Sequence, residues 1–376
     1  MQDANDGRQQ QFLESLAAGW APHRHVRGPV VVAVSGGGDS VALLRGLHQL
    51  LAADFPQSAE TGRRGEQALG VPGSQRLVVA HARHDLREGH PGDPAASDAA
   101  FVRQLADTLS LPYEEAFLEV RQAAEGGEGL EAAARRLRYG FLQETAEAYG
   151  ARLVVTAHSA DDQVETVLHR LLRGTGLAGL AGIAPVRSLV EGIVVVRPML
   201  TLTAQAARDY LRALEQPWQE DATNADTRYA RNLIRQELLP RMSAGPYPAV
   251  REAMLRLADQ AADAHATSTA ACLALLEAYG TEEPSGTVLL KTGPLATFPS
   301  QLLADMVATL WRQQGWPQRD MTSRHYAAVA AVLANSAGNP ACLDLPGGLR
   351  ADTVANGQVR LGPTGLRPHL APQPHL

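Results

Sequence analysis

Six consecutive residues have the composition of a loop that binds phosphates: Ser35, Gly36, Gly37, Gly38, Asp39 and Ser40. Glycines allow backbone N–H groups to approach an anion closely, and the two serine hydroxyls are further donors. A carboxylate in such a loop repels phosphates unless a cation lies between them, so Asp39 indicates a bridging Mg²⁺. No GK[ST] triplet follows, which excludes a Walker A loop. A plain Gly-rich turn is the alternative for the three glycines taken alone.

A later polar stretch contains four side chains suited to acid–base or metal chemistry: His158, Asp161, Asp162 and Glu165. Asp162 and Glu165 are three residues apart, so they share a face on a helix. Acids beside a triphosphate can bind Mg²⁺ or orient a nucleophile. These four residues and Asp39 are therefore catalytic candidates, with Asp39 and Asp162 as candidate metal ligands. Ordinary helix capping, with Asp161 as N-cap and Glu165 as its capping-box partner, is the alternative.

Arginines in two places are candidates for binding RNA phosphates: Arg173, Arg228, Arg231 and Arg235. The last three lie on one predicted helix with few acids between them, which would form a local basic patch. A generic basic face explains that helix equally well. Arg170 and Arg173 precede a Gly-rich stretch, where a basic helix end also complements the helix dipole.

The elements around these motifs alternate between strands and helices. Buried strands are predicted at 30–34, 77–81, 112–120, 153–156 and 193–196, with helices at 41–51, 98–109, 130–149 and 162–172. Gly150 is placed as the C-cap of the third of these helices. This alternation predicts an α/β fold with a doubly wound, mostly parallel sheet. Such sheets bind ligands at the carboxyl ends of their strands, where both polar motifs lie.

From residue 203 the pattern becomes helical, and short strands return near the end of the chain. Helices are predicted at 203–214, 225–239, 249–279, 300–312 and 324–333, and strands at 341–345, 348–352 and 358–361. We therefore expect a catalytic domain at 1–216, a helical substrate domain at 217–338 and a strand-containing segment at 339–376. The stretch 55–75 has the composition of a surface insertion.

The composition restricts the classes of function. The 376 residues carry a net charge of −6, so an RNA site must be a local basic patch on an acidic protein. The two cysteines, Cys272 and Cys342, form no CxxC motif and are expected to be small core residues. No apolar run is long enough to span a membrane, and the first residues are polar, which predicts a cytoplasmic protein without a membrane partner.

The motifs resemble those of a known family. SGGGDS between a strand and a helix resembles the SGGxDS loop of the PP-loop ATP pyrophosphatases. AHSADDQVET followed by LLRGTGLAGL resembles the AHHxDDQxET and RGxGxxGL signature of tRNA(Ile)-lysidine synthetases. Four further segments agree in order: EAAAR with RY at 131–139, RPML at 197–200, DATN with RN at 221–232, and LPGG at 345–348.

The resemblance implies an adenine nucleotide α-hydrolase-like fold and a two-step reaction. ATP, with Mg²⁺, would adenylate the C2 oxygen of the first anticodon cytidine of an isoleucine tRNA with a CAU anticodon. Free L-lysine would then displace AMP. The resemblance also implies that three residues lie near the nucleotide and lysine: Glu131, Arg135 and His84. For the stripe at Glu131 and Arg135 a solvated helix face is the alternative, and for His84 a structural histidine is.

Two positions depart from the family pattern, and three other functions remain open. Asp85 replaces the glycine of the HGLR motif, and Ser159 replaces the second histidine of AHH, so any role of that histidine is absent or moved. The alternatives are a PP-loop tRNA thiolase, a small-molecule synthetase of the NAD or GMP type, and a non-catalytic RNA-binding protein. Homodimerisation is left open.

Overall fold

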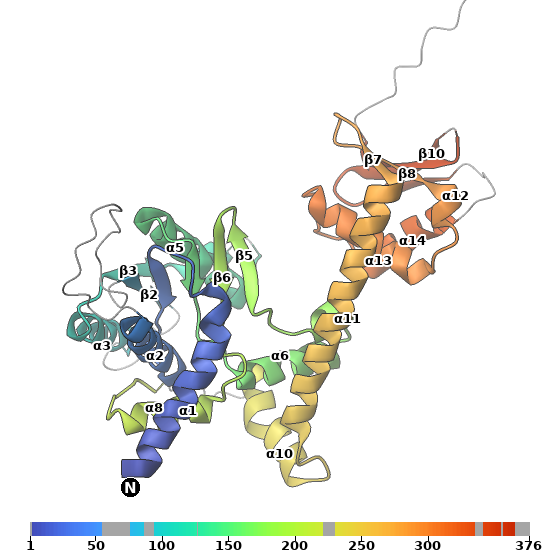
Figure 1. Ribbon diagram of the computed structural model, residues 1–376. Helices are drawn as coiled ribbons and strands as arrows, with labels where there is room; N and C mark the ends of the chain where they lie inside the picture. The colour runs from blue at the N-terminus through green and yellow to red at the C-terminus, as the bar shows by residue number, and fades with distance from the viewer. Residues whose placement is uncertain are drawn as a thin grey trace, which may run out of the picture. The chain divides into compact units, whose positions relative to one another are not determined.

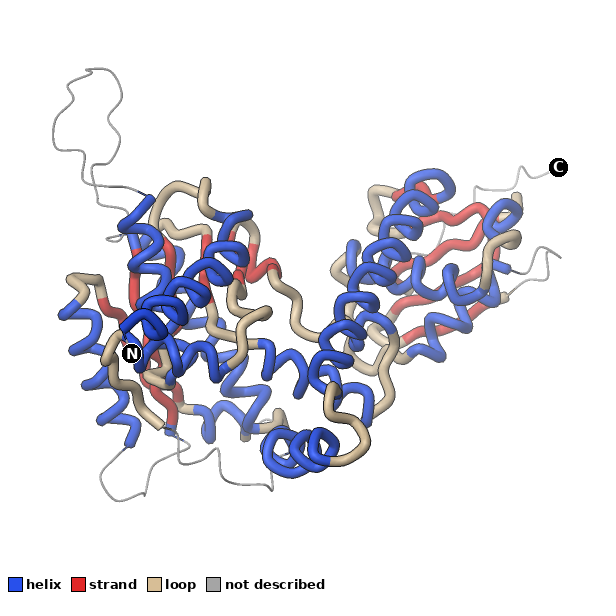
Figure 2. Tube along the Cα trace, turned by 60° about the horizontal axis from the view of Figure 1, so that its bottom comes forward, coloured by secondary structure: helices blue, strands red, loops and turns tan. Residues whose placement is uncertain are grey.

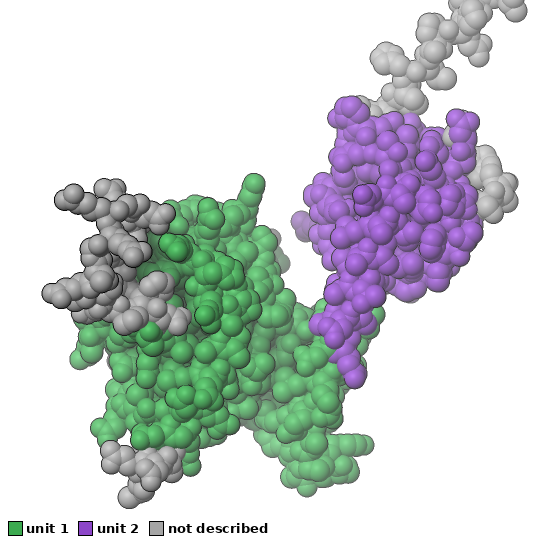
Figure 3. Space-filling model, in the orientation of Figure 1, with its two compact units in different colours: residues 1–259 green, residues 260–376 purple. Residues whose placement is uncertain are grey.

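The computed structural model describes residues 2–54, 76–85, 94–125, 127–220, 230–334, 341–354 and 356–364. By its internal contacts the chain divides into two compact units, Met1–Asp259 and Gln260–Leu376 (Figure 3). The predicted insertion at 55–75, the whole DATN motif at 221–224 and Arg228 lie outside the described residues.

The first unit contains a six-stranded sheet with the order β3-β2-β1-β4-β6-β5. Its strands are β1 (Val30–Ala33), β2 (Leu77–His84), β3 (Tyr113–Leu118), β4 (Leu153–Val155), β5 (Val186–Val190) and β6 (Ile193–Val196). All neighbours pair in parallel except β5, which runs antiparallel to β6 at one edge. The predicted mostly parallel sheet is confirmed. The sequence analysis missed β5, because its exposed Val186, Arg187 and Ser188 break the pattern of a buried strand.

Helices cover both faces of this sheet (Figures 1 and 2). Val30 and Val32 point into a core shared with one group of helices, and Val31 and Val154 point into a second core against α5 (Leu130–Tyr149). A strand buried on both faces reads as a continuous apolar run, which explains VVVA in β1. The first group comprises α1 (Gln2–Trp20), α2 (Gly38–Asp54), α3 (Pro94–Thr108) and α8 (Ala204–Ala213).

Helix α5 begins and ends where the sequence predicted. Gly150 has a φ of +64° and donates its N–H to the last carbonyls of the helix, as a C-cap glycine does. α5 runs from the carboxyl edge of the sheet toward the opposite edge, so its first turns lie at the edge where ligands bind. The short α4 (Val120–Ala124) precedes it.

A group of shorter helices completes the first unit. Val164 and Leu168 of α6 form a small core with Ile234, Leu239 and Val250. The described residues around Ile234, Leu239 and Val250 therefore belong to the first unit, while the domain boundaries at 216/217 and 338/339 remain expectations. These elements are α6 (Ala160–Leu172), α7 (Leu177–Leu180), α9 (Ala230–Leu233), a π-helical turn (Ile234–Leu238), α10 (Leu239–Ala244) and α11 (Val250–Tyr279).

The helix predicted at 225–239 is interrupted in its described part. A π-helical turn separates α9 from α10, and Pro240 stands in the first turn of α10. Proline has no amide hydrogen to donate and disturbs the helix before it. Among the described helices none is long and apolar enough to cross a bilayer.

The second unit combines helices and an antiparallel sheet around one core. The sheet has the order β7-β8-β11-β10-β9, and Trp311, Leu290 and Leu361 are fully buried between it and the helices. Cys272 is buried here, but Cys342 is exposed, so the expectation of two core cysteines is wrong for Cys342. The elements are β7 (Gly280–Glu282), β8 (Val288–Lys291), α12 (Thr292–Leu295), α13 (Ser300–Gln313), α14 (Ser323–Ala334), β9 (Cys342–Leu345), β10 (Leu349–Val354) and β11 (Gln358–Pro363).

Candidate functional site

The Gly-rich loop joins β1 to α2 and is closed by its own hydroxyls. The Ser40 hydroxyl donates to the Gly37 carbonyl at 2.9 Å and accepts from the Ser35 N–H at 3.2 Å. Gly36 has a φ of +94°, a conformation that favours glycine, and its carbonyl accepts from the Gln219 N–H at 3.0 Å. The loop thus has a fixed shape at the amino end of a 17-residue helix, as a phosphate site requires.

Asp39 lies in the first turn of α2 and faces other acids. Burial, together with the charges of Asp162 and Asp161, raises the pKa of its carboxyl to about 6, although Arg208 and Arg235 oppose the shift. A carboxyl shifted in this way is placed where negative charge accumulates without full compensation. Its oxygen donors suit Mg²⁺, which takes one or two carboxylates together with phosphate oxygens. Within the described residues no group of three or more protein ligands converges on a metal position.

The start of α6 differs from the predicted cap. Ser159 is the N-cap: its hydroxyl accepts from the Asp162 N–H at 3.5 Å, and Asp162 Oδ2 accepts from the Ser159 N–H at 2.9 Å. The interpretation with Asp161 as N-cap and Glu165 as capping partner is wrong, because the helix begins at Ala160. The residue that replaces the family's second histidine therefore starts the helix that carries the acids.

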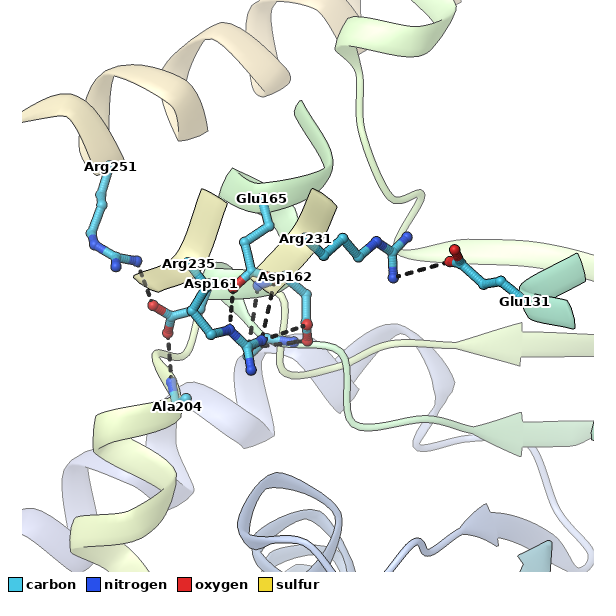
Figure 4. Close-up of polar contacts among 9 residues, drawn as sticks. Glu131, Asp161, Asp162, Glu165, Ala204, Arg231, Arg235 and Arg251 are labelled. Carbon is cyan, nitrogen blue, oxygen red and sulfur yellow. Dashed lines mark hydrogen bonds and ion pairs between the residues drawn. The ribbon is translucent and has the colours of Figure 1, made fainter. Parts of the chain in front are cut away.

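Asp161 is held by two distant elements (Figure 4). Its Oδ2 accepts from the Ala204 N–H of α8 at 2.8 Å, and its Oδ1 accepts from Arg251 Nη1 of α11 at 2.6 Å. Both oxygens are thus engaged within the protein. Asp161 is predicted as catalytic, but these contacts support a role in fixing α6 against α8 and α11.

Glu165 is paired with an arginine that was expected to contact RNA (Figure 4). Arg235 donates to Glu165 Oε1 at 2.5 Å and to Oε2 at 3.2 Å, and its Nη2 lies 3.6 Å from Asp162 Oδ1. The Glu165 carboxyl is 3% exposed, and burial raises its pKa although Arg235 opposes the shift. The Arg235 guanidinium therefore neutralises two site acids.

His158 follows β4 and is kept neutral. Its Nδ1 lies 2.9 Å from the Thr156 hydroxyl, within hydrogen-bond distance. Burial lowers the pKa of its imidazole to about 4, and the opposing charge of Asp162 does not restore it. An imidazole that is neutral near pH 7 can accept a proton or position a polar group, but it supplies no positive charge.

Two side chains of α6 fix the glycine-rich loop that follows. The Gln163 carbonyl oxygen accepts from the Ile183 N–H at 2.6 Å, and Arg170 donates to the Gly182 carbonyl at 2.7 Å and the Gly179 carbonyl at 3.1 Å. Arg170 thus holds the glycine-rich loop in place, whereas the sequence suggested a charge that complements the dipole at the end of the helix. Arg173 remains exposed at the end of α6.

The residues expected near the nucleotide and lysine lie on α5 and at the end of β2. Glu131 is 3.9 Å from Arg231, and both side chains are exposed, so this pair is weak (Figure 4). The Arg135 guanidinium lies 5.0 Å from the centre of the Tyr139 ring. His84 is the last residue of β2 and is half-buried.

Asp85, which stands where the family pattern has glycine, has a structural role that the sequence did not indicate. Its carboxylate is buried and accepts from the Val120 N–H at 3.0 Å and the Arg121 N–H at 3.1 Å. It therefore caps α4 from a different segment, because the local N-cap Glu119 makes no side-chain cap bond. A glycine at this position would leave these two N–H groups without that acceptor.

The structure brings part of the predicted set together. Asp39 interacts electrostatically with Asp161, Asp162 and Arg235, which joins the phosphate loop to the acids of α6. Arg173 has no ion pair among the described residues. Sequence reasoning missed Arg208 and Arg251, which neutralise acids of the site, because nothing in their local sequence indicates a partner more than 80 residues away.

Comparisons with known proteins identify the family of this domain. The family model of the PP-loop domain matches residues 7–242. A tRNA(Ile)-lysidine synthase of Rhodopirellula baltica is 41% identical over 240 residues, which are 62% of this chain and 58% of the relative. One of Thermus thermophilus is 42% identical over 236 residues, which are 62% of this chain and 39% of the relative. The chain thus spans between about two fifths and three fifths of the length of these relatives.

A solved structure with a similar arrangement is the U34-tRNA thiolase of Methanococcus maripaludis. It is 13% identical, covers 68% of this chain and 79% of its own, and has a TM-score of 0.47.

Proposed function

Because this chain belongs to the PP-loop domain family, we propose that it forms lysidine on an isoleucine tRNA with a CAU anticodon, using ATP and free L-lysine. The observation that carries the proposal is the phosphate loop facing a set of acids at the carboxyl edge of the sheet, in a chain about 40% identical to tRNA(Ile)-lysidine synthases. Phosphates and an amine substrate need these two environments side by side.

In the first step the C2 oxygen of the cytidine attacks the α-phosphorus of ATP, and the bond to pyrophosphate breaks. The fixed loop from Ser35 to Ser40 would hold the leaving pyrophosphate through backbone N–H groups at the start of α2. Asp39 and Asp162 would hold Mg²⁺, which supplies positive charge to the phosphates when bound. The role of each residue is part of the proposal.

In the second step the lysine amine attacks C2, and AMP leaves with the oxygen. The amine must lose its proton first, and a carboxylate or a neutral imidazole can accept it. Asp162 and His158 are proposed for this, because Oδ1 of Asp162 only faces Arg235 at 3.6 Å, whereas both oxygens of Asp161 accept hydrogen bonds, from Arg251 and Ala204. Glu131, Arg135 and His84 are proposed to border the same pocket.

The RNA contacts are also proposals. Arg231 and Arg173 are exposed and can reach phosphates, and Arg228 belongs to the same predicted helix. Arg235 is reassigned from phosphate binding to holding Glu165 and Asp162. The helices beyond 217, including those of the second unit, are proposed to contact the tRNA. A cytoplasmic location and a homodimer remain proposals.

The thiolase alternative receives no support from the placement of sulfur. Cys272 and Cys342 both belong to the second unit, whereas the phosphate loop and acids belong to the first.

The test is incorporation of labelled lysine. Purified protein is incubated with Mg²⁺-ATP, radiolabelled lysine and an isoleucine tRNA transcript with a CAU anticodon, with methionine tRNA as control. Acid-precipitable label that requires ATP and the isoleucine transcript is expected. Release of pyrophosphate without label would contradict lysine as the substrate and leave the adenylation chemistry in place.

A further inference from the structure

A cleft of about 460 Å³ lies between α5 and β5, outside the acid cluster. Its lining includes Arg135, Arg136, Tyr139, Gln143, Arg187 and Leu189, and none of its lining residues is acidic. In a chain of net charge −6, three arginines around one acid-free cleft form a local concentration of positive charge.

The arginines are organised around one aromatic ring. The guanidiniums of Arg187 and Arg135 lie 4.5 Å and 5.0 Å from the centre of the Tyr139 ring. Arg197, which is 3% exposed, donates to the Tyr139 hydroxyl at 3.3 Å, and its buried Nε has no hydrogen-bond partner among the described residues. Stacking on tyrosine fixes the guanidinium planes and leaves their N–H edges available to an anion.

Little negative charge within the protein neutralises this group. Among the described residues neither Arg135 nor Arg187 forms an ion pair with a carboxylate, and Arg136 pairs only with the exposed Glu128, at 2.8 Å. Although burial opposes the change, Arg197, Arg135 and Arg187 lower the pKa of the Tyr139 hydroxyl, which shows the positive field they create there. The charge is therefore available for an external anion.

The position of the cleft fits a polynucleotide that enters the site. Arg187 pairs with Val195 next to the end of β6, and α5 begins at the same edge of the sheet as the phosphate loop. Arg135 and Gln143 are eight residues apart, which is about 12 Å along the helix axis and longer than one phosphate. Since the Tyr139 ring is already covered by guanidiniums, base stacking on it is disfavoured and phosphate contact is favoured.

We propose that the α5–β5 cleft binds backbone phosphates of the RNA substrate through Arg187 and Arg136, with Arg135 between the cleft and the nucleotide and lysine pocket, and so leads the RNA toward the phosphate loop. This inference rests on the proposed function. It gives the acidic protein an RNA surface separate from the arginines of α9 and the π-helical turn.

The test is a titration of fluorescent tRNA by anisotropy over a range of chloride concentrations. Arg187→Glu should weaken binding about tenfold and reduce the slope of log affinity against log salt by about one, because one phosphate contact is lost. Arg187→Lys should retain most of the affinity. Arg152→Glu is the matched control, since Arg152 is exposed in the same unit but precedes β4 at the opposite edge. Melting curves verify that each variant is folded.

The outcomes separate this inference from the function on which it rests. If the wild type binds the isoleucine tRNA and Arg187→Glu has the same affinity and salt slope as Arg152→Glu, the cleft proposal is overturned and lysidine formation stands. If the wild type binds no tRNA, the proposed function is overturned as well. Inorganic phosphate should displace RNA no better than chloride at equal ionic strength; selective displacement by phosphate would assign the cleft to a small anion and overturn the proposal.

Discussion

The phosphate loop and the start of α6 are both polar and both end a strand of the same sheet, but they are stabilised differently. In the loop, Ser35 and Ser40 bond to backbone within six residues. In α6, Asp161 and Glu165 are neutralised by Arg251 and Arg235, which follow them by 90 and 70 residues. When the polar groups of a motif bond to neighbours in sequence, the sequence alone indicates what the motif does. When they bond to arginines far along the chain, the sequence does not show which acids are still free to bind a ligand.

The variant Asp39→Asn tests this contrast most directly, because Asp39 belongs to the loop but interacts electrostatically with the acids of α6. We expect at least about a hundredfold loss of ATP-dependent pyrophosphate release, since the proposed metal ligand and its charge are removed. The measurement is a pyrophosphate-release assay across Mg²⁺ concentrations. Turnover equal to the wild type would refute the metal role of Asp39.

Arg235→Ala tests whether the distant arginine is structural. Glu165 would remain buried without its partner, and we expect a loss of about 2 kcal/mol in the free energy of unfolding, less than for a fully buried pair because Arg235 is partly exposed. Urea denaturation measures it, with Arg231→Ala as control because the Arg231–Glu131 pair is exposed. Unchanged stability with weaker tRNA binding would return Arg235 to the RNA-binding set.

The pH dependence of stability distinguishes Asp39 from its neighbours. A carboxyl whose pKa is raised from 3.8 to about 6 holds its proton longer in the folded state, so its contribution to stability falls as pH rises from about 4 to about 6. Without ATP, Asp39→Asn should therefore be more stable than the wild type at pH 7, by about 2 kcal/mol, and equal to it near pH 4.

The wild-type curve alone does not isolate this effect. His158, whose pKa is lowered to about 4, contributes stability that is lost as pH falls through the range from 6.5 to 4, which has the opposite sign. The difference between the unfolding curves of the wild type and Asp39→Asn cancels the histidine. A difference that does not change between pH 4 and pH 7 would show that Asp39 is solvated and not crowded by acids.

The smallest expected effect concerns the cap of α6. Ser159→Ala should cost about 1 kcal/mol of stability, because the Asp162 N–H loses its acceptor. Thr203→Ala is the matched control: Thr203 caps α8 through the Ala206 N–H at 3.1 Å. Both variants should lose similar stability by thermal melting, but only Ser159→Ala should lower activity, since it removes one of the two Ser159 donors that orient Asp162 Oδ2, the hydroxyl at 3.2 Å. If both variants had the same activity, the capping hydroxyl of Ser159 would have no role in the reaction.

Local signals predicted most of the first unit. Alternating apolar runs located five of the six strands, and Gly150 marked the end of α5, because both signals depend on neighbours in sequence. The antiparallel β5 was not predicted, because Val186, Arg187 and Ser188 are exposed on both of its faces and break the pattern of a buried strand. The packing of α9, α10 and the start of α11 on α6 was not predicted, because no local pattern in the sequence records these contacts.

For the candidate site, the structure shows which predicted residues lie near one another, and their roles remain proposals. The phosphate loop was recognised from composition and position alone. Asp161 and Arg235 were assigned to chemistry and RNA, but each is engaged with a distant partner. The role of Asp85 could not be predicted for the same reason, because the N–H groups of α4 that it caps lie 35 residues further along the chain.

The exposed edge strand β5 has a consequence for solubility. A strand at the rim of a sheet offers unpaired backbone groups to a second copy of the chain, which is a common start of aggregation. Arg187 is the second residue of β5, so a second copy pairing along this edge would have to accommodate a guanidinium from each chain, and charged side chains of this kind disfavour edge-to-edge pairing. The charge at Arg187 therefore disfavours association of two copies through β5, and the same charge attracts a polyanion.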